Sequence, residues 1–145
     1  MSYTRLLCHI VFATKNRAPL IDDAWAADLC AYLAGAIRGI GGHPLEINAV
    51  QDHVHMLVDV KAVIALSEFM SKLKANSSAW AKAKRKGFSW QPKYGAFSVS
   101  ESQVEIVRKY IRNQQQHHRK MAFDDEFRKL LRAHGIEFEE EHLWT

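Results

Sequence analysis

A pair of histidines is the feature of this sequence with the clearest chemical potential. His53 and His55 are separated by one residue in the run Asp52-His53-Val54-His55-Met56-Leu57-Val58-Asp59. The run is rich in apolar and β-branched residues, which predicts a strand. Side chains two apart on a strand share a face, with Cβ atoms roughly 7 Å apart, so both imidazoles could reach one cation. The pattern alone leaves a metal site and two ordinary histidines as alternatives.

A phenol and a carboxamide downstream could complete such a site. Tyr110 and Gln114 are four residues apart in a predicted helix, so they share a helical face. The Gln114 amide oxygen is a neutral metal ligand, and the phenol is a nucleophile if its proton, with an ordinary pKa of about 10, can be lost. Mg²⁺ and Mn²⁺ require about six ligands, mostly oxygen, so two imidazoles are too few. The alternative is that Tyr110 packs in the core and 114–116 form a solvated face.

The elements that must position these residues follow the order β-α-β-β-α-β. Strands are expected at 3–15, 45–50, 53–60 and 95–100, and helices from Asp22 or Asp23 to 38 and at 67–85, 103–118 and 124–133. This order is typical of the ferredoxin-like arrangement, an α+β fold. We expect a four-stranded antiparallel sheet with helices on one face, the histidine strand central, and a site on the open face next to the C-terminal helix 103–118. Leu143 and Trp144 are predicted to anchor the tail.

The composition indicates an ordinary globular protein. The chain has 145 residues, 48% hydrophobic and 25% charged, which suits one domain over residues 1–145. No apolar run approaches the roughly 20 residues that a membrane helix requires, and the first residues lack the organisation of a signal peptide. Cys8 and Cys30 have no paired spacing, which predicts free thiols and a cytoplasmic protein.

The distribution of positive charge suggests a polyanionic partner. The formal net charge is +4, and basic residues gather in two zones, one near 72–93 and one near 108–120. Contacts to a nucleic-acid backbone are expected from Lys72, Lys74, Lys82, Arg85, Arg108 and Arg112. A solvated helix face is the alternative for any single lysine.

The two reactive segments together resemble a known family. Asp52-His53-Val54-His55 with the apolar residues that follow is similar to the His-hydrophobic-His motif of HUH endonucleases. Tyr110-Ile111-Arg112-Asn113-Gln114, followed by His117-His118, resembles the catalytic helix of single-tyrosine transposases of the insertion-sequence and REP-associated type. The resemblance continues in residues 9–15, 94–100, 135–138 and 143–144, so it spans nearly the whole chain in order.

This resemblance implies a function for each motif. His53, His55 and Gln114 would bind Mg²⁺ or Mn²⁺, and Tyr110 would attack single-stranded DNA to form a 5′-phosphotyrosine and free a 3′-hydroxyl. The partner would be hairpin DNA at element ends, in the nucleoid of a bacterium or archaeon. The family typically forms homodimers, with segment 98–103 as a hinge and the tyrosine acting in cis or in trans.

Two rival functions remain open. One is a domesticated REP-associated transposase that acts on chromosomal palindromes. The other is a non-catalytic nucleic-acid-binding module, which would place exposed aromatic residues on the central strands; the run 53–60 contains none.

Several further residues receive more modest interpretations. His9 and His43 are interpreted as core or loop histidines. Asp52 is expected to order the turn or to bond an imidazole, and it should point away from both histidines. For Trp90, packing in the core and stacking on a nucleic-acid base both remain open. His117 and His118 are interpreted as structural, with a place behind the metal ligands or facing DNA as the alternative.

Overall fold

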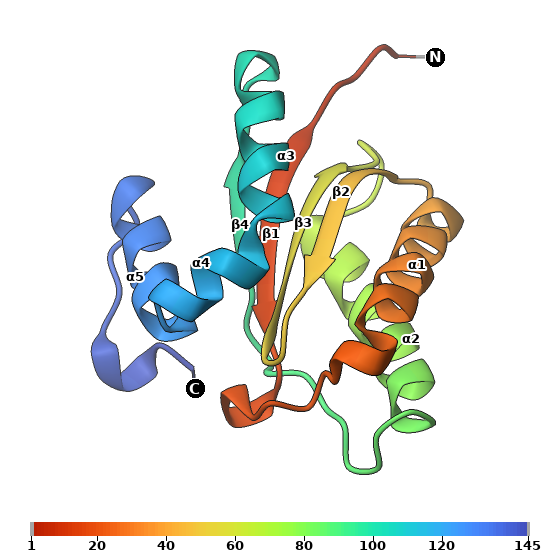
Figure 1. The fold of residues 1–145 in the computed structure, drawn as a ribbon. Coiled ribbons are helices and arrows are strands. Elements are labelled where there is room, and N and C mark those ends of the chain that lie inside the picture. Colours follow the sequence, from red (N-terminus) through yellow and green to blue (C-terminus); the bar gives the residue numbers. More distant parts are fainter. Residues whose placement is uncertain (1, 145) are drawn as a thin grey trace.

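Four antiparallel strands form the sheet of this molecule in the computed structural model, which describes residues 2–144 (Figure 1). From edge to edge they lie in the order β2 (His43–Ala49), β3 (His53–Asp59), β1 (Leu7–Ala13) and β4 (Gly95–Ser98). The histidine strand β3 is therefore central, antiparallel to β1 on one side and to β2 on the other. This is the predicted ferredoxin-like fold of the α+β class.

Two long helices cover one face of the sheet. They are α1 (Asp23–Ile40) and α2 (Leu66–Lys82). The four-residue spacing predicted for the first helix is confirmed, because its buried residues are Trp25, Leu29, Leu33 and Ile37. These pack against alternate residues of the central strands, among them Ile10, Phe12, Val54, Met56 and Val58. The alternation of β1 and β3 thus sends one set of apolar side chains into this core.

The opposite face, which we expected to be open, is covered by the C-terminal helices (Figure 1). These are α3 (Val104–Arg112), α4 (Gln114–Lys120) and α5 (Phe123–Ala133). Val104 and Ile111 of α3 cluster with Leu57 of β3. A second cluster joins α5 to β1 and β4 through Val11, Ala13, Phe97, Phe123, Phe127 and Leu131. The physical reason is that this face of the sheet also carries apolar side chains, whose burial stabilises the fold.

The predicted helix 103–118 is divided into two helices, so the prediction of one continuous helix was wrong. α3 ends at Arg112, and Asn113 has φ −92° and ψ 16° before α4 begins at Gln114. Asn48 of β2 donates from Nδ2 to the carbonyls of Ile111, at 2.8 Å, and Arg112, at 3.2 Å. These bonds satisfy carbonyls that a helix end leaves without partners, so the chain can turn there.

The remaining boundaries differ from the predictions by a few residues. The first strand is shorter than expected, and α2 begins at Leu66 after Ala65. Short 3₁₀ turns lie at Lys15–Arg17, Glu101–Gln103 and Glu140–His142. Leu143 is buried and Trp144 packs against the same cluster as α5, which confirms both tail anchors. Within residues 2–144, no helix combines the length and apolarity that crossing a membrane would require.

Candidate functional site

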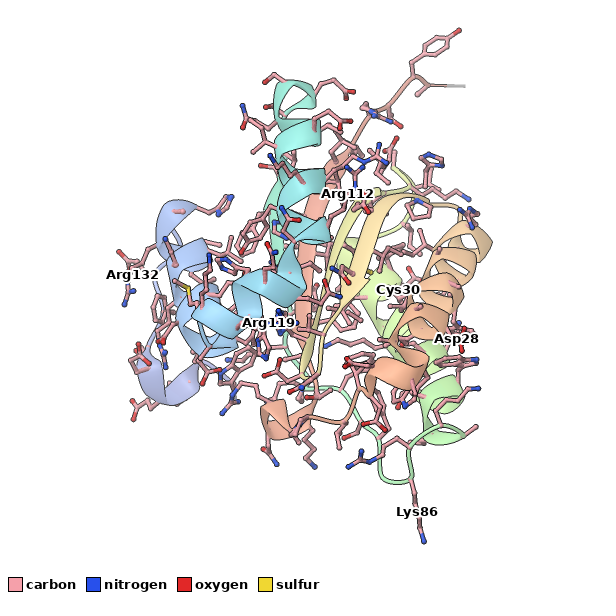
Figure 2. All side chains as sticks on the ribbon, in the orientation of Figure 1. Asp28, Cys30, Lys86, Arg112, Arg119 and Arg132 are labelled. Atoms are coloured by element: carbon pink, nitrogen blue, oxygen red, sulfur yellow. The ribbon has the colours of Figure 1, made fainter. Side chains whose placement is uncertain are left out.

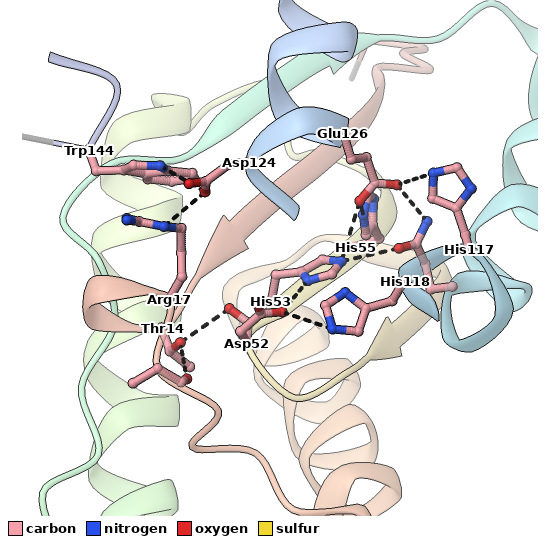
Figure 3. Close-up of polar contacts among 12 residues, drawn as sticks. Thr14, Arg17, Asp52, His53, His55, His117, His118, Asp124, Glu126 and Trp144 are labelled. Carbon is pink, nitrogen blue, oxygen red and sulfur yellow. Dashed lines mark hydrogen bonds and ion pairs between the residues drawn. The ribbon is translucent and has the colours of Figure 1, made fainter. Parts of the chain in front are cut away.

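The two histidines of β3 lie together beneath the C-terminal helices. Their side chains point to the side of the sheet that α3, α4 and α5 cover, and both are fully buried, with 0% exposure. The His55 Nε2 atom lies 3.2 Å from Glu126 Oε1, and the His53 Nε2 atom lies 3.4 Å from the same oxygen. Figure 3 shows this carboxylate of α5 above the two rings. The predicted shared face is therefore confirmed, with a third group between the rings.

His9 belongs to the same cluster, which the sequence interpretation missed. Its Nε2 atom lies 2.8 Å from His55 Nδ1, across the β1–β3 pairing. Burial and the neighbouring His55 lower the pKa of His9 to about 3. Burial lowers the pKa of His55 to about 4, against the opposing effect of Glu126. Both rings are therefore neutral near pH 7, the form in which imidazole binds metals.

Asp52 orients the other histidine. Its Oδ1 atom lies 2.7 Å from His53 Nδ1, as one of the two predicted roles requires. Burial opposes a charge on His53, but hydrogen bonds to Asp52 and Glu126 outweigh it and raise the pKa of His53. Asp52 reaches the ring because it lies in the bend before β3, where strand alternation does not hold. The Phe123 ring stacks on His53 with centroids 4.1 Å apart, which fixes the imidazole plane.

Tyr110 and Gln114 reach the histidines despite the break in the helix. The Tyr110 hydroxyl donates to Glu126 Oε2. Gln114 Nε2 donates to the same oxygen at 3.1 Å, and Gln114 Oε1 lies 3.1 Å from His53 Nε2. Burial and the adjacent carboxylate raise the pKa of Tyr110 well above its ordinary value. The phenol is consequently a protonated donor in this arrangement.

Glu126 is the main residue that sequence reasoning missed. It is 3% exposed and contacts both histidines, Tyr110 and Gln114, with His117 Nε2 3.2 Å from its Oε2. Burial would raise the pKa of Glu126, but the hydrogen bonds from the histidines and from Tyr110 hold it well below its ordinary value. In the sequence it follows Asp124 and Asp125, and three acids in the first turn of a helix resemble a solvated N-terminus. No periodicity linked it to β3.

The donor set fits a divalent cation. Ligand atoms of His53, His55 and Glu126 all lie within 4.8 Å of one another, and Gln114 adds an amide oxygen. Two imidazoles with two oxygen donors suit Mn²⁺ better than Mg²⁺, which prefers oxygen ligands. His118 lies beside His53, with its Nε2 atom 3.9 Å from Asp52 Oδ1. His117 and His118 thus lie beside the site, which agrees with the alternative that the sequence analysis gave for them.

A cavity of about 650 Å³ opens beside Tyr110. Its walls come from β1, the end of β4 and the residues after it, and from α3, α4 and α5, and they include His9, Val99, Ile106, Val107, His117 and Leu130. Tyr110 and Glu126 both lie on its wall. A substrate that fills this cavity would therefore meet the phenol without displacing the histidines.

The basic residues predicted to bind nucleic acid do not form one patch. Lys72 and Lys82 lie on α2, and Arg85 follows it, so all three are on the face of the sheet away from Tyr110. Arg108 and Arg112 lie on α3, where both guanidinium groups pair with Glu46 of β2, at 3.2 and 3.0 Å. Figure 2 shows Arg112 at the end of α3, Arg119 on α4, and Lys86 far from both, in the loop that follows α2.

Lys74 and Trp90 have structural contacts. Lys74 Nζ donates to the carbonyls of Gln91, Pro92 and Lys93, at 2.6, 3.2 and 2.9 Å. Burial lowers the pKa of Lys74 to about 8. Trp90 is buried and donates from Nε1 to Ser77 Oγ at 3.0 Å, so the choice left open for it resolves in favour of packing.

Known proteins share this sequence pattern and fold. The family "Transposase IS200 like" matches residues 2–114. The ISDra2 transposase TnpA of Deinococcus radiodurans is 27% identical over 114 residues, which cover 73% of this chain and 81% of the relative. A crystal structure described as that of a candidate transposase from D. radiodurans R1 has a TM-score of 0.63 and 25% identity over 78% of this chain and 93% of that one. A REP-associated tyrosine transposase bound to a REP hairpin shares the fold, with a TM-score of 0.62 and 13% identity over 81% of this chain and 72% of that one.

Proposed function

Because this chain belongs to the IS200-like transposase family, we propose that it cleaves and rejoins single-stranded DNA through a covalent link to Tyr110. The observation that carries the proposal is that one carboxylate, Glu126, contacts the Tyr110 hydroxyl and both histidines of β3. A nucleophile and a set of metal-ligand atoms therefore meet at one point beside a cavity. This proximity supports phosphodiester cleavage by a tyrosine next to a metal ion.

The proposed chemical step is the one that the family resemblance implies. The Tyr110 oxygen forms a bond to phosphorus as the bond from phosphorus to the 3′-oxygen breaks. The phenol gives up its proton and the departing 3′-oxygen takes one, which leaves a 5′-phosphotyrosine and a 3′-hydroxyl. His53, His55 and Gln114 would hold Mg²⁺ or Mn²⁺, which when bound supplies positive charge at the phosphate. Rejoining reverses the step with a new 3′-hydroxyl, so no ATP is needed.

The partner in this proposal is single-stranded DNA that carries a hairpin. The fold shared with a transposase bound to a REP hairpin supports this class of ligand. We assign Arg108 and Arg112 to contacts with the DNA backbone from their charge; both pair with Glu46 of β2, so DNA would have to compete with this carboxylate for them. Lys72, Lys82 and Arg85 would serve a hairpin stem on the other side of the molecule.

One assay tests the proposal. Labelled single-stranded DNA with a hairpin from the native element ends is incubated with the protein and Mn²⁺, and a covalent adduct is sought on a denaturing gel. Wild-type protein should form the adduct; its absence on native ends would overturn the proposal. Tyr110→Phe should abolish the adduct and retain hairpin binding, and His53→Ala should abolish metal-dependent cleavage. Tyr94→Phe is the matched control, because Tyr94 packs with the core on the other face of the sheet.

A domesticated transposase that acts on chromosomal palindromes is the second candidate. The observation that favours it is that Tyr110 reaches the histidines of its own chain, so a monomer would contain a complete site. A homodimer that exchanges its tyrosine helices is the mobile-element alternative, with 98–103 as the hinge. Light scattering distinguishes them by mass, and mixing Tyr110→Phe with His53→Ala protein restores cleavage only if helices are exchanged.

A further inference from the structure

The carboxylate of Glu126 occupies the position of a metal ligand. Its Oε1 atom lies 3.2 Å from His55 Nε2 and 3.4 Å from His53 Nε2, while Gln114 Oε1 lies 3.1 Å from His53 Nε2. Neighbouring ligand atoms around an octahedral cation of the Mg²⁺ type are separated by about 3.0 Å. Around a tetrahedral cation such as Zn²⁺ the separation is about 3.4 Å. The observed spacings fall in this interval, so the four side chains need little movement to share one ion.

The charge of the donor set leads to the same conclusion. Two neutral imidazoles and a carboxamide would hold a divalent cation without any formal negative charge. Hard cations prefer anionic oxygen ligands, and Glu126 supplies one from inside the same buried cluster. A buried carboxylate is also costly unless it is paired, and a cation at this point would compensate its charge. We infer that Glu126 is a ligand of the catalytic metal, so that the centre consists of His53, His55, Gln114 and Glu126.

The second oxygen of the same carboxylate serves the nucleophile. Oε2 accepts hydrogen bonds from the Tyr110 hydroxyl and from Gln114 Nε2, and it lies 3.2 Å from His117 Nε2. Glu126 thus joins the metal centre to the phenol through one rigid group. It lies on α5, beyond residues 2–114 that match the transposase family, so the ligand comes from the C-terminal part of this chain.

The packing of α5 makes such a ligand stable. Phe123 and Phe127, on either side of Glu126 in sequence, are buried against Val11 and Ala13 of β1. The Phe123 ring also stacks on His53. The helix cannot shift without exposing these rings, and the carboxylate is therefore held over the histidines in advance of metal binding.

The test measures metal binding by the DNA-free full-length protein and rests on the proposed function. Mn²⁺ alone is titrated and the free ion is followed by electron paramagnetic resonance. Glu126→Gln should weaken binding at least tenfold, whereas Asp125→Asn, an exposed carboxylate on the same helix, should bind like wild type. Binding by Glu126→Gln within threefold of wild type would overturn the inference. If Glu126→Gln binds Mn²⁺ normally but His55→Ala does not, the proposed function stands without this inference. If neither His53→Ala nor His55→Ala weakens Mn²⁺ binding, the proposed function is overturned.

A second variant keeps the inference testable if Glu126→Gln fails to fold. Glu126→Cys places a soft thiolate on the same face of α5, closer to the helix than the carboxylate oxygens, and its preference for Cd²⁺ should draw that ion towards position 126. A thiolate-to-cadmium charge-transfer band should appear on Cd²⁺ addition to Glu126→Cys, and it should be absent from Asp125→Cys and from wild type, whose own thiols are Cys8 and Cys30. A Glu126→Cys protein that binds Cd²⁺ without this band would show that position 126 does not reach the ion.

Discussion

Asn48 on edge strand β2 donates a hydrogen bond from its Nδ2 atom to the main-chain carbonyl of Ile111, 2.8 Å away at the end of α3. The same amide group donates to the carbonyl of Arg112 and exchanges hydrogen bonds with the side chain of Gln115. The contact lies directly after Tyr110 and directly before Gln114. It therefore marks the point at which the chain turns between Tyr110 and Gln114.

Replacement of Asn48 by alanine should loosen this turn. Loss of hydrogen bonds to two helix-end carbonyls should lower the free energy of unfolding by about 1–2 kcal/mol. Adduct formation should fall at least tenfold, because Tyr110 and Gln114 lose their fixed relation, while hairpin affinity stays within twofold. Urea unfolding and adduct yield on a denaturing gel measure the two effects. Asn76→Ala, on the exposed side of α2, is the matched control. Normal adduct yield in Asn48→Ala would show that the turn is fixed without this residue.

His9 should tune the metal centre through His55. When His55 Nε2 binds an ion, its Nδ1 must carry the proton and donate it to His9 Nε2, 2.8 Å away. Groups that orient a metal-bound histidine in this way typically contribute 10–100-fold in affinity. His9→Phe should therefore weaken Mn²⁺ binding about tenfold, as measured by titration of the DNA-free protein. His43→Ala, exposed on β2, should bind normally. Equal affinities in His9→Phe and wild type would remove His9 from the centre.

The parts of the site that could be predicted are those set by local geometry. Strand periodicity placed His53 and His55 on one face, and that holds in the structure. Helical spacing brought Tyr110 and Gln114 together, and they meet on one oxygen even though the helix breaks between them. The break is bridged by hydrogen bonds from Asn48, which is far away in sequence, so these contacts could not be read from the residues around Asn113.

The residues that escaped prediction owe their positions to tertiary packing. Glu126 reaches the histidines only because α5 folds back over β1, and its sequence neighbours Asp124 and Asp125 suggest a solvated turn. His9 is brought to His55 by pairing between strands whose register a single sequence does not fix. Lys74 was interpreted by charge, yet its environment is set by the carbonyls of a loop that α2 approaches only in the folded chain.

Lys74 should prove important for stability, unlike the lysine two positions before it. Replacement by methionine would leave the carbonyls of Gln91, Pro92 and Lys93 without their donor, and the free energy of unfolding should fall by about 1.5–3 kcal/mol. Lys72 forms only an exposed pair with Glu68, so Lys72→Met should change stability by less than about 0.5 kcal/mol. Thermal and urea unfolding measure both. If Lys74→Met kept full stability but lost hairpin affinity, the original expectation of a DNA contact would hold.

The buried histidines should make the metal-free protein sensitive to mild acid. Unfolded histidine takes up a proton near its ordinary pKa of 6.5, whereas His55 and His9 in the folded state do so only near 4 and 3. The unfolded state therefore binds more protons between these values, and stability falls as pH is lowered from about 6.5 towards 4. Each such histidine contributes a slope approaching about 1.4 kcal/mol per pH unit.

Other titratable groups at the site should not mask the fall in stability between pH 6.5 and 4. The raised pKa of His53 has the opposite sign, but its effect lies above pH 6.5, and below that value both states carry its proton. Glu126 has a lowered pKa, so its contribution is lost only below its ordinary value of 4.5. The titratable neighbours that affect the pKa of His9 are His55 and His134, which lower it, and Glu126, which raises it. Urea unfolding in EDTA at pH 6.5, 5.7 and 5 should give falling stability, with about half the slope in His9→Phe. A constant free energy of unfolding from pH 6.5 to 5 would mean that neither ring is buried as a neutral group.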